Sequence, residues 1–237
     1  NGMRGTNLYI NDGLGNFSNS KKSLKTDSFS GSVAVPADFD NDGDLDVFVG
    51  GRHLPHEYPL PADSKLLENI NGVLVDVTQA KAVDLNKIGM VTDAIWTDYD
   101  NDKDLDLMLV GEWMPIVVFE NVNGTFLKQS LPSLKNTEGW WFSIEQGDFD
   151  HDGDMDYIAG NLGLNYKYKT SVENPFDVYY KDFDGNGSND VVLGYYNYGK
   201  HYPLRGFSCS SQQIPSLKKD FKKYDIFASL EIKDIYG

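Results

Sequence analysis

The sequence is poor in cysteine and histidine and lacks long apolar segments. Its 237 residues, enough for one substantial domain, include one cysteine, Cys209, and four histidines. A single thiol excludes an intrachain disulfide. No apolar run approaches the roughly 20 residues of a transmembrane helix. A mean hydropathy of −0.44 with 40% hydrophobic residues indicates a soluble, globular chain rather than a disordered one.

Basic residues are also few, with 21 Lys and Arg against 36 Asp and Glu and a net charge of −15. This excess of negative charge argues against nucleic acid as a partner. Half of the acidic residues, 18 of 36, lie in four short segments. Carboxylates packed so closely repel one another, so we expect folding to be coupled to the binding of cations. Four divalent ions would bring the net charge from −15 to −7.

These segments are copies of one nine-residue pattern. The copies begin at Asp38 (DFDNDGDLD), Asp98 (DYDNDKDLD), Asp148 (DFDHDGDMD) and Asp182 (DFDGNGSND). Oxygen-bearing side chains stand at positions 1, 3, 5 and 9, position 7 can offer its carbonyl, and Gly at position 6 permits a sharp turn. Such an oxygen-rich loop fits Ca²⁺ better than Mg²⁺, which requires a stricter octahedron. No Cys or His occupies a ligand position, which argues against zinc and copper.

The residues around the pattern exclude an EF-hand. An EF-hand needs a glutamate at position 12 and flanking helices. Position 12 is apolar in every copy: Val49, Leu109, Ala159 and Leu193. Short β-branched runs such as Val33–Val35 and Val47–Val49 flank the first loop and predict strands. The unit is therefore predicted to be a β-hairpin whose connecting loop binds metal.

A second hairpin signature accompanies the loops. Runs that turn at Asn-Gly or Asp-Gly occur at residues 7–17, 67–74 and 118–126. Four antiparallel strands per repeat predict a propeller blade, and residues 1–17 correspond to the outer half of one. The loops start 60, 50 and 34 residues apart, so the third interval is too short for a full blade.

The predicted fold class is all-β, a β-propeller of four-stranded antiparallel blades with a short helical C-terminal segment. Apolar residues spaced by three or four, such as Leu217, Phe221 and Tyr224, predict one or two short helices between about residues 214 and 235, with Ser216 as an N-cap. We expect propeller blades over residues 1–207 and a helical extension or insertion over residues 208–237.

The pattern D-x-D-x-D-G-x-x-D between short strands resembles the FG-GAP/VCBS repeat of integrin α-subunit propellers and secreted bacterial proteins. The stretches DFDNDGDLDVFVGG, LYINDGLGNF and VGEWMP resemble most the bacterial VCBS and cartilage-acidic-protein-like groups, and the resemblance covers about residues 7–194. It implies calcium-binding loops and a propeller of usually seven blades. Four repeats do not close such a ring, so we expect a longer parent protein.

The resemblance implies up to four Ca²⁺ ions. The implied ligands are Asp38, Asp40, Asp42, Asp44 and Asp46; Asp98, Asp100, Asp102, Asp104 and Asp106; Asp148, Asp150, Asp152, Asp154 and Asp156; and Asp182, Asp184, Asn186, Ser188 and Asp190, with position 7 acting through its carbonyl. Two departures weaken individual sites. Lys103 replaces the turn glycine, and Asn186 replaces a carboxylate. Loops one and three are therefore expected to bind most tightly.

The chain segments that leave the opposite ends of the strands form a candidate ligand face. Its residues are Arg52, His53, His56, Tyr58, Glu112, Trp113, Asn161, Asn165, Tyr166, Lys167, His201 and Arg205. Aromatic, cationic and amide groups of this kind bind sugars or acidic ligands, although such loops also serve only to pack between blades. For Trp140 and Trp141, core packing is favoured over sugar stacking.

The function that we expect is a calcium-binding, non-catalytic binding or adhesion module for a protein or glycan. No G-x-S-x-G, Walker, Rossmann or H-E-x-x-H motif occurs. One alternative is a polysaccharide lyase or hydrolase, with Arg52, His53, Lys167, His201 and Arg205 around a cleft; another is a purely architectural repeat. Abundant calcium favours an extracellular, cell-surface or periplasmic location.

Overall fold

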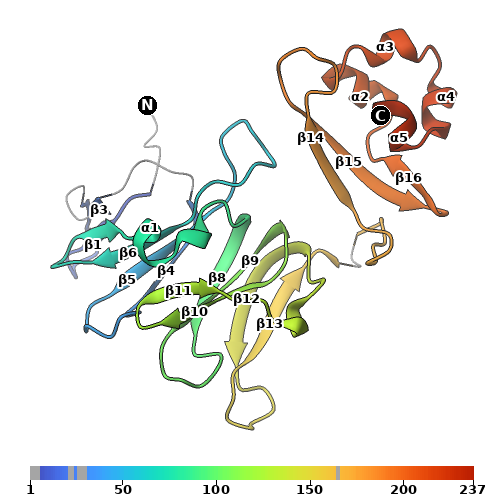
Figure 1. The fold of residues 1–237 in the computed structure, drawn as a ribbon. Helices are drawn as coiled ribbons and strands as arrows, with labels where there is room; N and C mark the ends of the chain where they lie inside the picture. Colours follow the sequence, from blue (N-terminus) through green and yellow to red (C-terminus); the bar gives the residue numbers. More distant parts are fainter. Residues whose placement is uncertain (1–5, 21–23, 26–30, 164–165) are drawn as a thin grey trace. The chain divides into compact units, whose positions relative to one another are not determined.

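The computed structural model describes residues 6–20, 24–25, 31–163 and 166–237 (Figure 1). The chain divides into two compact units: the larger holds residues 1–56 and 60–162, and the smaller holds residues 57–59 and 163–237. Antiparallel sheets dominate, which confirms the all-β class. Within the described ranges, no helix combines the length and apolarity needed to span a bilayer.

The first repeat of the larger unit is a sheet in the order β3-β7-β6-β5-β4. Its strands are β3 (Leu24–Lys25), β4 (Gly31–Ala37), β5 (Asp46–Gly51), β6 (Lys65–Asn69) and β7 (Leu74–Asp76). The pairs from β4 to β7 are antiparallel, while β3 joins β7 in parallel. β1 (Tyr9–Asn11) and β2 (Phe17–Asn19) form a separate hairpin. The first acidic loop joins β4 to β5, so the predicted hairpin around this loop is confirmed.

The second repeat has the same four-strand order and the third is shortened. The strands of the second are β8 (Met90–Thr97), β9 (Asp106–Met114), β10 (Val117–Val122) and β11 (Thr125–Lys128). Among the described residues, the third has only β12 (Gly139–Gly147) and β13 (Asp156–Asn161), and β12 also pairs with the end of β9. α1 (Thr78–Lys81) and two 3-10 turns (Val83–Leu85 and Pro132–Leu134) connect these sheets.

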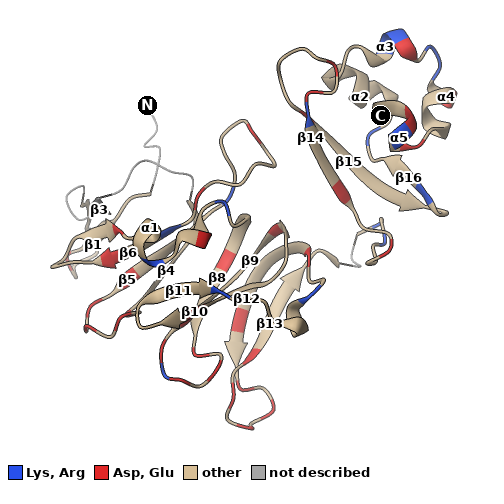
Figure 2. Cartoon of the chain, viewed as in Figure 1, with Lys and Arg blue, Asp and Glu red and all other residues tan. Residues whose placement is uncertain are grey.

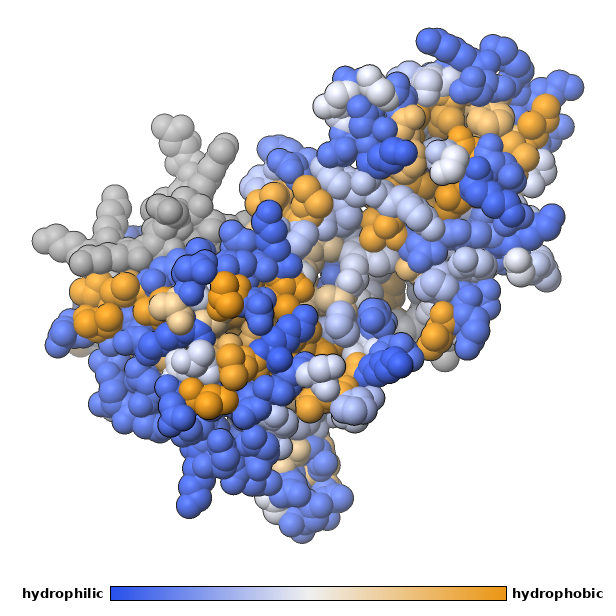
Figure 3. All heavy atoms as spheres, in the orientation of Figure 1, coloured by the Kyte–Doolittle hydropathy of each residue, from blue (hydrophilic) through white to orange (hydrophobic). Residues whose placement is uncertain are grey.

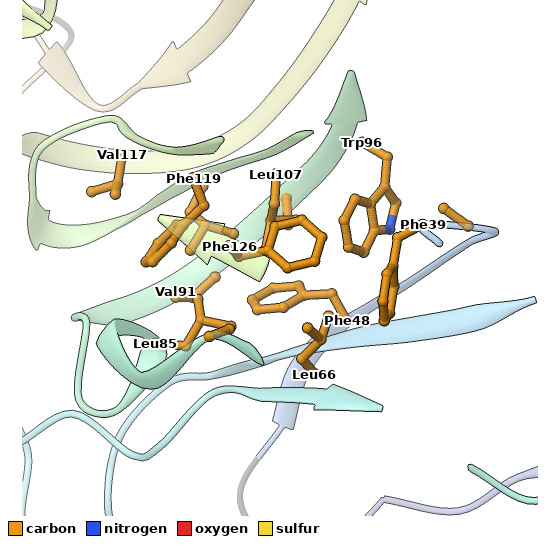
Figure 4. Close-up of a cluster of buried hydrophobic side chains, with 14 of the residues drawn as sticks. Phe39, Phe48, Leu66, Leu85, Val91, Trp96, Leu107, Val117, Phe119 and Phe126 are labelled. Carbon is orange, nitrogen blue, oxygen red and sulfur yellow. The ribbon is translucent and has the colours of Figure 1, made fainter. Parts of the chain in front are cut away.

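The main core lies between the first and second repeats (Figure 4). Phe39, at position 2 of the first loop, is 1% exposed and faces Trp96 and Phe126 of the second repeat. Tyr99, at the same position of the second loop, packs against a cluster that contains Ile144 of the third repeat. The aromatic residue at position 2 therefore joins each of these two repeats to the next. Phe149, its counterpart in the third loop, is 61% exposed.

The smaller unit combines one sheet with four short helices. Its elements are β14 (Asp177–Lys181), β15 (Asp190–Asn197), β16 (Lys200–Pro203), α2 (Phe207–Gln213), α3 (Leu217–Asp220), α4 (Tyr224–Ser229) and α5 (Ile232–Tyr236). The prediction of one or two helices was too low. α2 lay outside the predicted range because its sequence, FSCSSQQ, has little apolar periodicity. Ser216 stands at the N-cap of α3 but makes no side-chain cap bond.

Candidate metal centres

Each acidic loop is held by hydrogen bonds from its own backbone. In the first loop, Asp38 at position 1 accepts the N–H groups of Asp42 and Gly43, both at 3.0 Å. Asp42 at position 5 accepts the N–H of Asp44 at 3.0 Å. Asp46 at position 9 accepts the N–H of Phe39 at 3.1 Å. These backbone bonds close the nine residues into a turn.

The same set of bonds recurs in the other three loops. Position 1 accepts the N–H groups of positions 5 and 6, position 5 accepts that of position 7, and position 9 accepts that of position 2. Position 5 of the fourth loop is Asn186, and its Oδ1 accepts the backbone N–H of Ser188 at 2.8 Å. The Asn-for-Asp departure therefore preserves the shape of the turn.

Left-handed backbone conformations complete each turn. The residue at position 6 has a φ of 96° at Gly43 and 80° at Lys103. Position 4 is also left-handed, with a φ of 59° at Asn41 and 62° at Asn101. Asn and Gly tolerate this region, whereas a lysine there is strained. The backbone at position 6 therefore favours glycine, and Lys103 carries strain there.

Each loop brings carboxylate oxygens close enough to share one ion. The groups, each with oxygens within 4.8 Å of one another, are Asp38, Asp40 and Asp42; Asp98, Asp100 and Asp106; Asp148, Asp150 and Asp156; and Asp182, Asp184 and Asp190. Ligands at about 2.4 Å from a calcium ion are at most about 4.8 Å apart, so the spacing suits calcium. Of the remaining implied ligands, position 7 would act through its backbone.

Unpartnered oxygens in the first loop also fit a bound cation. The Oδ1 atoms of Asp40 and Asp44 are buried and have no hydrogen-bond partner among the described residues. Burial, together with the charges of Asp42, Asp40, Asp38 and Glu68, raises the pKa of the Asp44 carboxyl. A buried carboxylate oxygen without a partner is costly, and a cation would satisfy it. The donor set contains only oxygen, which matches the ligand preference of calcium.

The carboxylates at position 9 of the first two loops are deeply buried. Asp46 is 1% exposed and Asp106 is 0% exposed. Burial raises the pKa of each to about 6, although each accepts two backbone N–H groups. One of the two bonds runs from Phe39 or Tyr99 to Oδ2. The other runs to Oδ1 from Asn69 or Asn121 in the outer hairpin, at 2.8 Å in both cases. Position 9 therefore ties each loop to the next hairpin of its own repeat.

Lys81 introduces a competing cation beside the first loop. Its Nζ lies 3.6 Å from Asp40 Oδ2 and 2.5 Å from Glu68 Oε2. The ammonium also lies 5.3 Å from the centre of the Phe39 ring. Lys81 lies 41 residues from Asp40 in sequence, and the hydrophobic pattern carries no signal for the pair. A cation bound in this loop is repelled by Lys81.

The acidic loops of the larger unit lie along one edge of its sheets, where Figure 2 shows acidic residues gathered. The same edge is hydrophilic in the space-filling view of Figure 3. Each loop joins the two antiparallel strands of its hairpin. The strand exits that were predicted to carry a ligand lie at the opposite ends of these hairpins.

Three predicted ligand-face residues take part in two contacts. Arg52 pairs with Glu112, and Trp113 packs against Trp140. Arg52, after β5, forms an ion pair with Glu112 of β9, which is 2% exposed. Trp113 has a φ of 59°, and its ring centre lies 5.2 Å from that of Trp140. Trp141 packs against the core of the third repeat and donates to the carbonyl of Thr137 at 2.9 Å. Arg52, Glu112 and the Trp113–Trp140 pair thus lie where β5 and β9 end and β12 begins.

The other predicted ligand-face residues in or near the larger unit have separate surroundings. His53 forms a β-bridge with Pro61, and His56 is exposed with a φ of 68°. Asn161 is exposed at the end of β13. Tyr58 belongs to the smaller unit, and Asn165 lies outside the described residues.

Within the smaller unit, Tyr166 and Lys167 join an aromatic cluster. The Tyr166 ring centre lies 5.3 Å from that of Tyr168, and Lys167 Nζ lies 4.7 Å from the centre of the same Tyr168 ring. His201 pairs instead with Asp177, at 3.0 Å between Nε2 and Oδ2. Arg205 donates to Gln213 at 2.9 Å. The sequence did not predict a role for Asp177, because this residue lies on β14 and His201 lies on β16, and β15 separates the two strands.

Comparison with known families supports the repeat assignment. Residues 1–49 and 98–159 match the family model of the FG-GAP-like repeat, and these regions contain the first, second and third acidic loops. The match does not distinguish the VCBS or cartilage-acidic-protein-like groups. No curated protein matches this chain.

One similar solved structure comes from work on the specific recognition of non-reducing terminal N-acetylglucosamine by an Agrocybe aegerita lectin. It is 16% identical with a TM-score of 0.43, and the alignment covers 82% of this chain. This chain spans 58% of the length of that one. At this TM-score, the likeness carries no conclusion about fold or ligand.

Proposed function

We propose that this chain is a calcium-binding module of FG-GAP repeats with one Ca²⁺ in each of its four acidic loops. The observation that carries the proposal is the repeated turn itself. All four loops share one set of backbone bonds and gather three carboxylates whose oxygens lie within 4.8 Å. Side chains at positions 1, 3, 5 and 9 and the carbonyl of position 7 would hold the ion, which supplies compensating positive charge.

Calcium would stabilise each hairpin, because its ligands lie at the end of one strand and at the start of the next. Asp38 follows the end of β4 and Asp46 begins β5, so one ion would tie the two strands together at the loop end. The same relation holds for β8 and β9, for β12 and β13 and for β14 and β15. Binding energy at such a site adds to the free energy of unfolding. We also propose that the sheets are blades of a β-propeller.

Thermal unfolding tests the calcium proposal. We expect the melting temperature of the whole chain to rise by many degrees in millimolar calcium and to fall in EGTA, with a much smaller effect of magnesium. Replacement of Asp38 and Asp46 by Asn serves as a loop-one variant, and Asp63→Asn, outside the loops, serves as the control. Equal melting temperatures with and without calcium would contradict the proposal.

The second part of the proposal is that the module binds a protein or a glycan without catalysis, at a surface outside the cytoplasm. Support comes from the opposite ends of the hairpins, where half-exposed Arg52 is anchored by buried Glu112 and where Trp113 meets Trp140. An anchored guanidinium suits acidic groups, and paired aromatic rings suit sugars. Abundant free calcium outside cells fits loops of modest affinity.

A glycan array tests this part of the proposal. The calcium-loaded chain would be compared with the Arg52→Ala and Trp113→Ala variants and with Lys135→Ala as a control at an exposed site. Binding that both ligand-face variants lose and the control retains supports the proposal. Absence of binding to glycans, together with no calcium-dependent capture of a protein, would contradict it and leave the calcium proposal standing.

A further inference from the structure

One buried side chain connects the first and second acidic loops. Asn121, in β10, is 2% exposed. Its side-chain amide donates to the carbonyl of Phe39 at 2.8 Å and to that of Leu105 at 3.1 Å. Phe39 lies between positions 1 and 3 of loop one, and Leu105 lies between positions 7 and 9 of loop two. One amide therefore bonds the backbone of two candidate metal loops.

The remaining bonds of Asn121 fix its position. Its backbone N–H donates to Asp106 Oδ1 at 2.8 Å, and its Oδ1 accepts the N–H of Gly124 at 2.8 Å. Asn69 makes the same two bonds in the first repeat, to Asp46 and from Gly72. No bond from the Asn69 amide to another loop occurs among the described residues. Asn69 and Asn121 therefore share the bonds within their own repeat, whereas the bond to a neighbouring loop is made by Asn121.

A second bridge joins loops two and three. Asn101, at position 4 of loop two, donates through Nδ2 to Oδ1 of Asp154, at position 7 of loop three, at 3.1 Å. Thr97 and Tyr157 are in hydrogen-bond contact at 2.7 Å, and they flank loop two and loop three directly. Asn41 contacts Asp104 in the equivalent way at 3.4 Å. Adjacent loops are therefore connected in series from loop one to loop three.

We propose that loops one, two and three bind Ca²⁺ as a coupled series, with Asn121 joining loop one to loop two and Asn101 joining loop two to loop three. This inference rests on the proposed calcium function. An ion in one loop fixes the peptide groups that the bridging amide contacts, so part of the ordering of the neighbouring loop is complete before its own ion arrives. The coupling is reciprocal, because each ion favours the other equally.

Native mass spectrometry of the whole chain during a calcium titration tests this coupling. Independent sites of equal affinity would populate species with one and two ions in statistical proportions, and independent sites of unequal affinity would populate them more strongly. The coupled series predicts that singly loaded chains are suppressed at least about fivefold. Asn101→Gly removes the bridging amide yet suits the φ of 62° at this position. We expect this variant to accumulate partly loaded species.

Matched controls isolate the bridges from general effects of substitution. Asn123→Gly makes the same change at an exposed turn residue with a φ of 53°. For the buried bridge, Asn121→Ala is compared with Asn69→Ala, which loses the same local bond from its glycine. We expect Asn121→Ala to weaken coupling between the first two loops and Asn69→Ala to leave it. If Asn121→Ala does not fold, the exposed Asn101→Gly variant still decides.

The outcomes distinguish this inference from the function on which it rests. A wild-type chain that takes up no calcium contradicts both. Calcium uptake by the wild-type chain with partly loaded species at or above statistical proportions contradicts the coupling alone. Cooperative uptake that Asn101→Gly and Asn121→Ala leave unchanged contradicts the assignment to these two bridges. Loss of cooperativity in these variants, with both controls unchanged, supports it.

Discussion

The ring of Phe39 stacks on that of Trp96, with centroids 5.9 Å apart, and this contact joins the first acidic loop to the second repeat. The edge of Phe126 completes the enclosure, with its centroid 5.3 Å from that of Phe39. A residue of a candidate metal loop thus belongs to the main core. Metal binding and core packing are connected through the backbone of this one residue.

Phe39→Ala is expected to reduce the free energy of unfolding of the larger unit by about 3–5 kcal/mol, the usual effect of removing a buried phenylalanine. Phe149→Ala changes the same loop position in the third repeat, where the side chain is 61% exposed, and is expected to cost less than about 1 kcal/mol. Urea unfolding in calcium measures both. Tryptophan fluorescence reports the larger unit, which contains Trp96, Trp113, Trp140 and Trp141. Equal effects would refute this view of the core.

Lys103→Gly is expected to stabilise the protein by about 1 kcal/mol and to increase calcium affinity at loop two. The φ of 80° is strained for lysine and suits glycine, and the substitution removes a cation from the loop. The reverse change, Gly153→Lys, places lysine at a φ of 98° in loop three and is expected to have the opposite effect. Chelator competition and urea unfolding measure the two properties. A Lys103→Gly variant weaker in both would contradict the explanation.

The stability of the calcium-free protein is expected to fall as pH rises from about 4 to about 7. Burial raises the pKa of Asp46 and Asp106 to about 6 from the ordinary value of 3.8. The folded state therefore holds these protons more tightly than the unfolded state, and its advantage disappears as pH rises through the folded-state pKa. Urea unfolding at several pH values in calcium-free buffer measures the effect.

The double variant Asp46→Asn and Asp106→Asn provides the comparison for the pH series. Because Asn does not ionise, the fall in stability over this range is expected to become shallower. A wild-type protein that grows more stable between pH 4 and pH 7 without calcium would show that other groups dominate.

Lys81→Met is expected to increase calcium affinity at loop one by about three- to tenfold. The substitution removes an ammonium group that lies 3.6 Å from Asp40 and repels an incoming divalent ion. Without calcium, the same variant should be less stable, because Asp40 and Glu68 lose their partner. Lys65→Met, which breaks the 2.9 Å pair with Asp76, is the control. Affinity that falls in Lys81→Met would contradict this role.

The local parts of the structure could be predicted from sequence, because their signals are local. Alternating β-branched residues around the loop at Asp38–Asp46 predicted the hairpin, and apolar Val49 at position 12 excluded the EF-hand. The 34-residue interval before the fourth loop indicated that no full blade fits there, and it left open a shortened blade or a change of architecture. A positive φ at the turn position followed from glycine in three of the four copies.

The long-range parts could not be predicted in this way. The amide of Asn121 reaches a carbonyl 82 residues away, and Arg52 pairs with Glu112 across 60 residues. Such contacts depend on how neighbouring repeats are arranged, which periodicity does not encode. For the Asn121 contact the sequence does carry a signal, because aligning the outer hairpins of the two repeats places Asn69 and Asn121 at the same position. None existed for the positive φ of Trp113, a residue type that rarely adopts it.

Anomalous diffraction from crystals grown with calcium tests the central claim most directly. We predict calcium peaks between the carboxylates of the acidic loops, up to four per chain, strongest in the loops at Asp38–Asp46 and Asp148–Asp156. Each peak should lie about 2.4 Å from the oxygens at positions 1 and 3, and from position 5 in the first loop or position 9 in the other loops. Loops one and three without a peak at millimolar calcium would contradict the account.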